Sequence, residues 1–118
     1  MSQIRRCSIG IKILNEQLAK ATLNAIQQVH GGVITGLRIE WGTYHAFFEI
    51  TKTKSGGVEI IGDGYAAPIS FDQFKSLFMQ QYNAQAVAMA LQRMGYRTQQ
   101  VKLPKEPIFF PLYSAPNA

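Results

Sequence analysis

The alternation of hydrophobic and polar residues predicts a strand near the N-terminus, followed by a helix. Three isoleucines at positions 9, 11 and 13 alternate with Gly10 and Lys12, which is typical of a half-buried strand over residues 9–14. Asn15 then suits a helix N-cap, because its side chain can accept a hydrogen bond from a free backbone N–H. Apolar residues recur at helical spacing from Leu18 to Val29, and the sequence His-Gly-Gly at 30–32 predicts the end of the helix.

The middle of the chain predicts three strands. Residues 33–41 alternate as one strand, Gly42-Thr43 serves as a two-residue hairpin turn, and residues 44–52 form the return strand. On the return strand, alternation places one set of residues on one face (Tyr44, Ala46, Phe48 and Ile50) and a second set on the other (His45, Phe47, Glu49 and Thr51). A turn at 54–57 leads to a shorter third strand over residues 58–62.

A long helix is predicted over residues 71–94. Ser70 and Gln73 have the spacing of a capping box, and Gly95 ends the apolar stripe. Gln81 falls beside that stripe, so we expect its amide to be buried and hydrogen-bonded. A last strand over residues 96–103 completes the order β-α-β-β-β-α-β. This order predicts an α+β two-layer sandwich with a mostly antiparallel sheet and two helices on one face.

Residues 104–118 differ in kind from the rest of the chain. Prolines at 104, 107, 111 and 116 favour an extended conformation and exclude a helix. The segment also carries large apolar residues, which are too hydrophobic for a solvated tail: Ile108, Phe109, Phe110, Leu112 and Tyr113. We therefore expect a single domain over residues 1–103 and a tail that docks on that domain or on a partner.

Composition excludes several classes of protein. The 118 residues suffice for one core, and charges, glycines or prolines interrupt every apolar run before it reaches membrane-spanning length. Cys7 is the single cysteine, so no intrachain disulfide forms, and we expect a cytoplasmic protein. Twelve Lys and Arg against seven Asp and Glu give a net charge of +5, but the basic residues are scattered, which favours an ordinary solvated surface.

The segment from Phe74 to Tyr96 resembles a conserved hypothetical protein family of cyanobacterial and plastid genomes. The matching positions are Phe74, Phe78, Gln80, Tyr82, Val87, Leu91, Gly95 and Tyr96, while Ser2, Ile4, Ile11 and Lys12 are similar to the family's N-terminus. Gly62-Asp63-Gly64-Tyr65 looks like a reduced form of the family's aromatic-glycine segment, without its tryptophan. The family is uncharacterised, so the resemblance implies a cytosolic or stromal protein and assigns no catalytic residue.

Three candidate chemical sites are weak. Gly62-Asp63-Gly64 lacks the lysine and spacing of a phosphate loop, and Asp63 lacks companion carboxylates at metal-binding spacing. His30, His45 and Cys7 show no metal-ligand spacing, and His30 suits the C-terminal end of a helix. We therefore interpret residues 62–64 as a turn, with Asp63 and Tyr65 at its tip, and we expect no cofactor, no metal and no small-molecule substrate.

The sheet face opposite the predicted helices is the more informative candidate for a binding surface. If no helix covers it, Arg38, His45, Phe47 and Glu49 line this face together with Glu40 and Thr51. Basic and aromatic residues on an open sheet can stack single-stranded nucleic acid, but acidic residues repel phosphate and Phe47 is the single clear platform. A solvated face, or one buried by a partner or by the tail, is favoured.

These observations predict a small non-enzymatic interaction module, either self-associating or part of a larger assembly. It would bind protein through the apolar tail and the open sheet face, and Tyr82 on the long helix is a further interface anchor. A nucleic-acid-binding module that uses the basic surface and Phe47 is the alternative. An enzyme that uses His45 with Glu49 or Glu40 is the least favoured hypothesis, and no membrane partner is expected.

Overall fold

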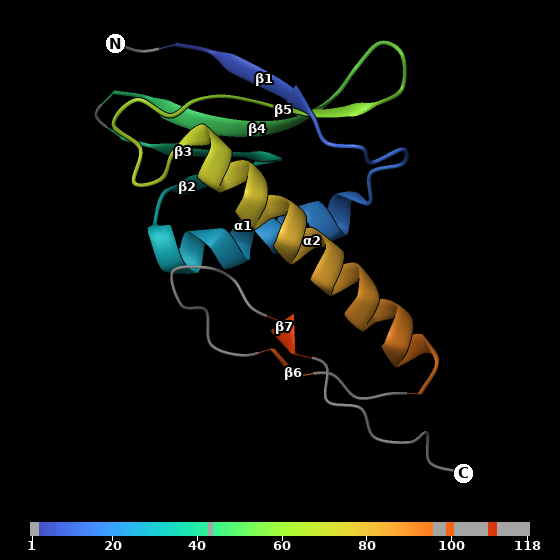
Figure 1. The fold of residues 1–118 in the computed structure, drawn as a ribbon. Coiled ribbons are helices and arrows are strands. Elements are labelled where there is room, and N and C mark those ends of the chain that lie inside the picture. Colours follow the sequence, from blue (N-terminus) through green and yellow to red (C-terminus); the bar gives the residue numbers. More distant parts are fainter. Residues whose placement is uncertain (1–2, 43, 96–98, 101–108, 111–118) are drawn as a thin grey trace.

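Five antiparallel strands form one sheet, and two helices cover one of its faces (Figure 1). The structure is a computed structural model that describes residues 3–42, 44–95, 99–100 and 109–110. Its elements are β1 (Arg5–Ser8), α1 (Glu16–His30), β2 (Val33–Thr35), β3 (Arg38–Trp41), β4 (Ala46–Lys52), β5 (Val58–Asp63) and α2 (Phe71–Arg93). The spatial order of the strands is β1-β5-β4-β3-β2. The predicted α+β class, with two helices on one face of an antiparallel sheet, is confirmed.

A column of aromatic rings joins the sheet to α2. Phe48 of β4 stacks on Phe74 at a centroid distance of 4.4 Å, and Phe74 continues to Phe78 at 6.0 Å. All three side chains are fully buried. Trp41 of β3 meets Phe48 edge-on at 5.7 Å, and its indole N–H donates to the carbonyl of His30 at the end of α1. The core therefore lies between the helices and one face of the sheet, and no described helix covers the opposite face (Figure 1).

The predicted ends of α1 are confirmed. The side chain of Asn15 accepts a hydrogen bond from the N–H of Leu18 at 3.1 Å, and the N–H of Gly31 donates to Gln27 at the other end. Lys52 of β4 lies 3.7 Å from Glu16 in the first turn of the helix. This ion pair connects the end of the central strand to the start of α1.

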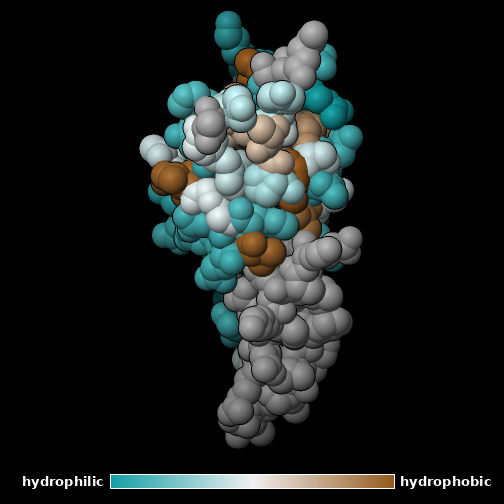
Figure 2. Space-filling model, turned by 90° about the vertical axis from the view of Figure 1, so that its left-hand side faces the viewer, coloured by the Kyte–Doolittle hydropathy of each residue, from teal (hydrophilic) through white to brown (hydrophobic). Residues whose placement is uncertain are grey.

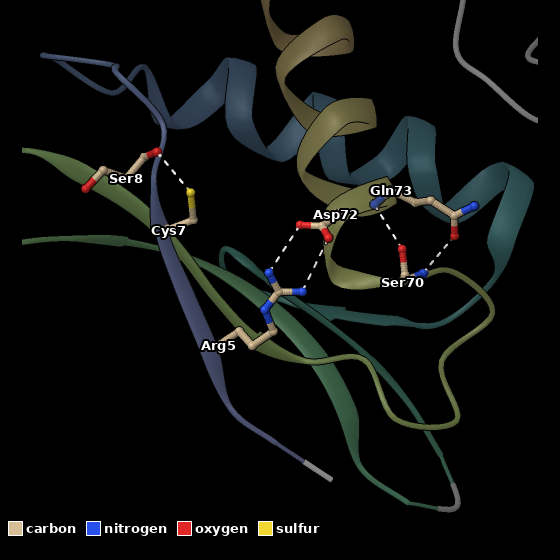
Figure 3. Close-up of polar contacts among 6 residues, drawn as sticks. All are labelled: Arg5, Cys7, Ser8, Ser70, Asp72 and Gln73. Carbon is tan, nitrogen blue, oxygen red and sulfur yellow. Dashed lines mark hydrogen bonds and ion pairs between the residues drawn. The ribbon is translucent and has the colours of Figure 1, made fainter. Parts of the chain in front are cut away.

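The start of α2 is held by two polar contacts (Figure 3). Ser70 and Gln73 form both hydrogen bonds of the capping box, at 3.1 and 2.9 Å, as predicted. Asp72 in the first turn pairs with Arg5 of β1 at 3.4 Å, and the Arg5 guanidinium also lies 4.8 Å from the centroid of the Phe71 ring. A carboxylate near a helix N-terminus is favoured by the helix dipole, so Asp72 suits this position.

The central part of α2 is uncharged from residue 76 to residue 92. Even so, no helix in the described ranges is long and apolar enough to cross a membrane. Gln81 is buried, as predicted, with 1% of its surface exposed. The expected hydrogen bonds are not made, because neither Oε1 nor Nε2 of Gln81 has a partner in the described structure. Among the described residues, the amide of Gln81 is therefore a buried polar group without a hydrogen-bond partner.

The predicted strand over residues 9–14 is wrong. The first strand lies earlier, at Arg5–Ser8, where Cys7 pairs with Ile60 of β5. Gly10 has a φ of 71°, a left-handed conformation that ends the extended backbone just after the last hydrogen bond from Ile9 to Val58. The alternating isoleucines are therefore not all on one buried face, and Ile13 is 88% exposed.

The predicted single strand over residues 33–41 is a hairpin. Thr35 pairs with Arg38, so Gly36 and Leu37 form a two-residue turn between β2 and β3. Gly36 has a φ of 60°, which a tight hairpin turn requires. Ile34 consequently pairs with Ile39, although strict alternation had assigned these two residues to opposite faces.

Two further boundaries differ from prediction. Trp41 pairs with Ala46, so β4 begins two residues later than expected and the connection is longer than the predicted turn at Gly42-Thr43. Within the predicted last strand, Gln99–Gln100 forms β6, which pairs with β7 (Phe109–Phe110) in a separate two-stranded sheet. Residues 96–98 and 101–103 lie outside the described residues.

Candidate functional site

The uncovered sheet face is the candidate site. Along β4, Ala46, Phe48 and Ile50 are buried under the helices, while Phe47, Glu49 and Thr51 point the other way and are half-buried. The strand register extends this face across the sheet, because Glu49 lies between Arg38 and Ile61, and Phe47 lies between Glu40 and Asp63. We call these residues, with Arg6, Glu59 and Thr51, the open face.

Arg38 of β3 contacts three other residues of this face. Its guanidinium carbon is 4.0 Å from the centroid of the Phe47 ring, so it covers one side of that ring. Its two terminal nitrogens pair with Glu40 and Glu49, each at 3.4 Å. The Arg38 side chain is 36% exposed, so water still screens these ion pairs. The predicted grouping of Arg38, Phe47 and Glu49 on one face is confirmed.

The open face carries more negative than positive charge. Its strand residues include four carboxylates (Glu40, Glu49, Glu59 and Asp63) and two guanidiniums (Arg6 and Arg38). Arg6 pairs with Glu59 at 3.1 Å, and Arg38 is shared between two carboxylates. The face is therefore acidic, although the whole chain has a net charge of +5.

Two exposed tyrosines lie at the end of the sheet where β4 begins and β5 ends. Tyr44, in the connection before β4, and Tyr65, just after β5, meet edge-on at a centroid distance of 6.0 Å and an interplanar angle of 73°. Tyr44 is 66% exposed and Tyr65 is 48% exposed. The N–H of Tyr65 donates to Asp63 Oδ1 at 3.0 Å, which ties this residue to the end of β5. We call these two residues the tyrosine pair.

The backbone beside the tyrosine pair is unusual. His45 and Ala66 are the non-glycine residues with positive φ in the described structure, at 54° and 63°. Each follows one of the two tyrosines directly. Such conformations cost free energy for residues with a Cβ, so the surrounding structure must hold them in place.

The space-filling view of this end of the sheet shows hydrophobic patches separated by hydrophilic residues (Figure 2).

The prediction that His45 shares the strand face with Phe47 and Glu49 is wrong. His45 precedes β4, and its left-handed backbone interrupts the alternation on which the prediction relied. Among the described residues, no hydrogen bond or ion pair joins His45 to Glu40 or Glu49. The structure therefore forms no histidine–carboxylate pair at this position.

Tyr82, the predicted interface anchor on α2, lies in the core. Its side chain is 7% exposed, its ring stacks on Phe78 at 5.7 Å, and its hydroxyl accepts a hydrogen bond from the N–H of Asn15. Tyr82 thus binds the start of α1 rather than a partner. Of the tail residues predicted to bind a partner, Phe109 and Phe110 form β7, and Ile108, Leu112 and Tyr113 lie outside the described residues.

A groove of about 850 Å³ lies between the end of α1 and the start of α2. Its lining includes His30, Asp72 and Ser76. No hydrogen bond joins these three side chains, so the described residues form no nucleophile–base pair there. Nor does the described part of the chain contain a group of three His, Cys, Asp or Glu residues that could hold a metal ion.

No protein-family model, curated protein or solved structure matches this chain. The resemblance of residues 74–96 to the cyanobacterial and plastid family stays a prediction. The open face is therefore the feature on which a function can be argued. Sequence reasoning placed Arg38, Phe47 and Glu49 on this face but not Ile61 or Asp63, because it assigned no faces to the third strand. It placed Asp63 and Tyr65 at the tip of a turn and did not predict the contact of Tyr65 with Tyr44.

Proposed function

We propose that this chain is a small non-enzymatic protein-interaction module, a subunit or accessory component of a larger assembly, and that its open face is the binding surface. The observation that carries the proposal is the mixed character of that face. Arg38 stacks on Phe47 and pairs with two glutamates on a surface that no described helix covers. Interfaces are enriched in aromatic residues and arginine, which are also the residue types that contribute most to binding energy.

The same geometry weighs against nucleic acid as the partner of this face. Stacking of a base on Phe47 would have to displace the Arg38 guanidinium from the ring, at least on the side that it covers. The carboxylates of Glu40, Glu49 and Asp63 would repel a phosphate backbone. A protein surface that bears lysine or arginine fits these charges better.

The experiment is affinity capture with the full chain as bait, from an extract of the organism that makes it. Glu49→Lys reverses a charge on the open face, and Glu16→Lys is the matched control, since Glu16 lies on the helix side and also forms an ion pair. A partner of the open face is retained by the wild-type chain and by Glu16→Lys, and lost with Glu49→Lys. Retention of the same proteins by all three baits would overturn the proposal.

A further inference from the structure

We propose that the open face and the tyrosine pair together bind a peptide segment that contains both proline and lysine or arginine. This inference rests on the proposed function and names the chemistry of the partner. Its two supports are independent of each other: the charge of the open face and the exposed aromatic side chains at the end of the sheet.

The first support is charge complementarity. Glu40 and Glu49 share a single guanidinium, that of Arg38, and their side chains remain 38% and 36% exposed. Asp63, in the next strand, uses one carboxylate oxygen, Oδ1, to accept from the N–H groups of Gln3 and Tyr65. The carboxylates of the open face are therefore available to pair with a cationic side chain of a partner. Complementary charges of this kind increase the specificity and the rate of association.

The second support is the shape of the tyrosine pair. Rings that meet edge-to-face at 73° form an apolar notch where the flat faces of the two rings stand at an angle to each other. Proline fits aromatic notches of this kind, because its ring is apolar and its extended conformation is formed before binding, which lowers the entropy lost on association. A nucleic-acid base or a sugar ring would instead stack flat on the face of a single exposed aromatic ring.

The position of the pair connects the two supports. Tyr65 is two residues beyond Asp63, the last residue of β5, and Asp63 is paired with Phe47 of the central strand β4. An extended peptide that places a proline against Tyr44 and Tyr65 therefore continues over Phe47 toward Glu40 and Glu49. The left-handed backbone at His45 and Ala66 defines the path of the two loops that carry the tyrosines.

The test uses three labelled decapeptides and the full chain, with binding followed by fluorescence anisotropy. The first peptide alternates proline and lysine, the second replaces lysine by glutamate, and the third replaces proline by alanine. We expect measurable binding of the first peptide alone, weakened by added salt. Equal binding of the glutamate peptide or of the alanine peptide, or stronger binding of an oligonucleotide of the same length, would overturn the inference.

Variants then locate the site. Tyr65→Ala should weaken binding of the proline–lysine peptide roughly tenfold, as an aromatic anchor residue does, whereas Tyr65→Phe should restore most of the affinity. Val87→Ala is the control, since Val87 is 49% exposed on α2, away from the open face. Binding that is unchanged in Tyr65→Ala would place the peptide elsewhere and overturn the inference. If no peptide binds while capture remains sensitive to Glu49→Lys, the partner chemistry is wrong and the proposed function stands.

Discussion

The guanidinium of Arg38 lies over the ring of Phe47, with 4.0 Å between the guanidinium carbon and the ring centroid. Arg38 belongs to β3 and Phe47 to β4, and the two strands are neighbours in the sheet. Direct pairing joins Arg38 to Glu49 and Phe47 to Glu40, so the stacked pair is the diagonal neighbour across the ladder. One arginine thus connects an aromatic ring and two carboxylates on the open face.

The replacement Arg38→Met should lower the free energy of unfolding by about 1 kcal/mol. The methionine keeps an apolar stem but removes the cation above Phe47 and leaves two glutamates without a partner; exposed cation–π contacts and surface ion pairs are each worth roughly 0.5–1 kcal/mol. Urea unfolding followed by circular dichroism measures the change.

Arg6→Met is the matched control for Arg38→Met. Arg6 is on the same face but forms one ion pair, with Glu59, and its side chain is 65% exposed. We expect the smaller loss for Arg6→Met. If Arg6→Met lowered the free energy of unfolding as much as Arg38→Met or more, the contact with the Phe47 ring and the second carboxylate would add nothing to stability.

Ser70→Ala should destabilise the chain by about 1 kcal/mol, because the serine side chain caps the first turn of α2. The N–H of Gln73 then loses its acceptor, and the reciprocal bond from Ser70 N–H to Gln73 remains as half of the box. Thermal unfolding provides the measurement.

Ser76→Ala makes the same chemical change inside α2, where Ser76 is exposed. Alanine is the better helix former at an interior position, so this variant should be neutral or slightly more stable. A loss as large as that of Ser70→Ala would contradict the assignment of the cap.

The sequence predicted the caps and the helix faces because these features are local. Asn15, Ser70 and Gln73 act on backbone groups three residues away, and no distant part of the fold is needed to place them. The two failed strands have the opposite cause. Gly10 and Gly36 are compatible with an alternating pattern, so the sequence does not show that their backbone is left-handed. That conformation follows from the pairing of β1 with β5 and of β2 with β3.

The candidate site was likewise predicted where it depends on local pattern and missed where it depends on contacts between distant segments. Alternation within β3 and β4 was enough to place Arg38, Phe47 and Glu49 on one face, although the stacking of Arg38 depends on the register between the strands. The tyrosine pair depends on two loops that are distant in sequence, and nothing in the residues 44 and 65 indicates that they meet. Burial of Tyr82 was missed because its hydroxyl satisfies the start of a different helix.

Tyr82→Phe should therefore lower the free energy of unfolding by about 1 kcal/mol, since it removes the acceptor of the Asn15 N–H and keeps the ring stacked on Phe78. The measurement is urea unfolding. Tyr65→Phe is the control, since the Tyr65 ring is 48% exposed and no hydrogen bond of its hydroxyl is seen in the described structure. Equal stability of Tyr82→Phe and the wild-type chain would show that the hydroxyl is not needed at the start of α1.

Gln81→Met should make the chain more stable, by about 1 kcal/mol or more. The amide of Gln81 is 1% exposed, and among the described residues no hydrogen bond compensates for its removal from water. Methionine has a similar length and no strong polar group, so it fills the same space and removes that cost. The control is Gln80→Met on the exposed side of α2, which should change stability by less than about 0.5 kcal/mol. Urea unfolding of both variants decides the matter: a loss of stability in Gln81→Met alone would mean that the amide is hydrogen-bonded in solution, as the sequence had indicated.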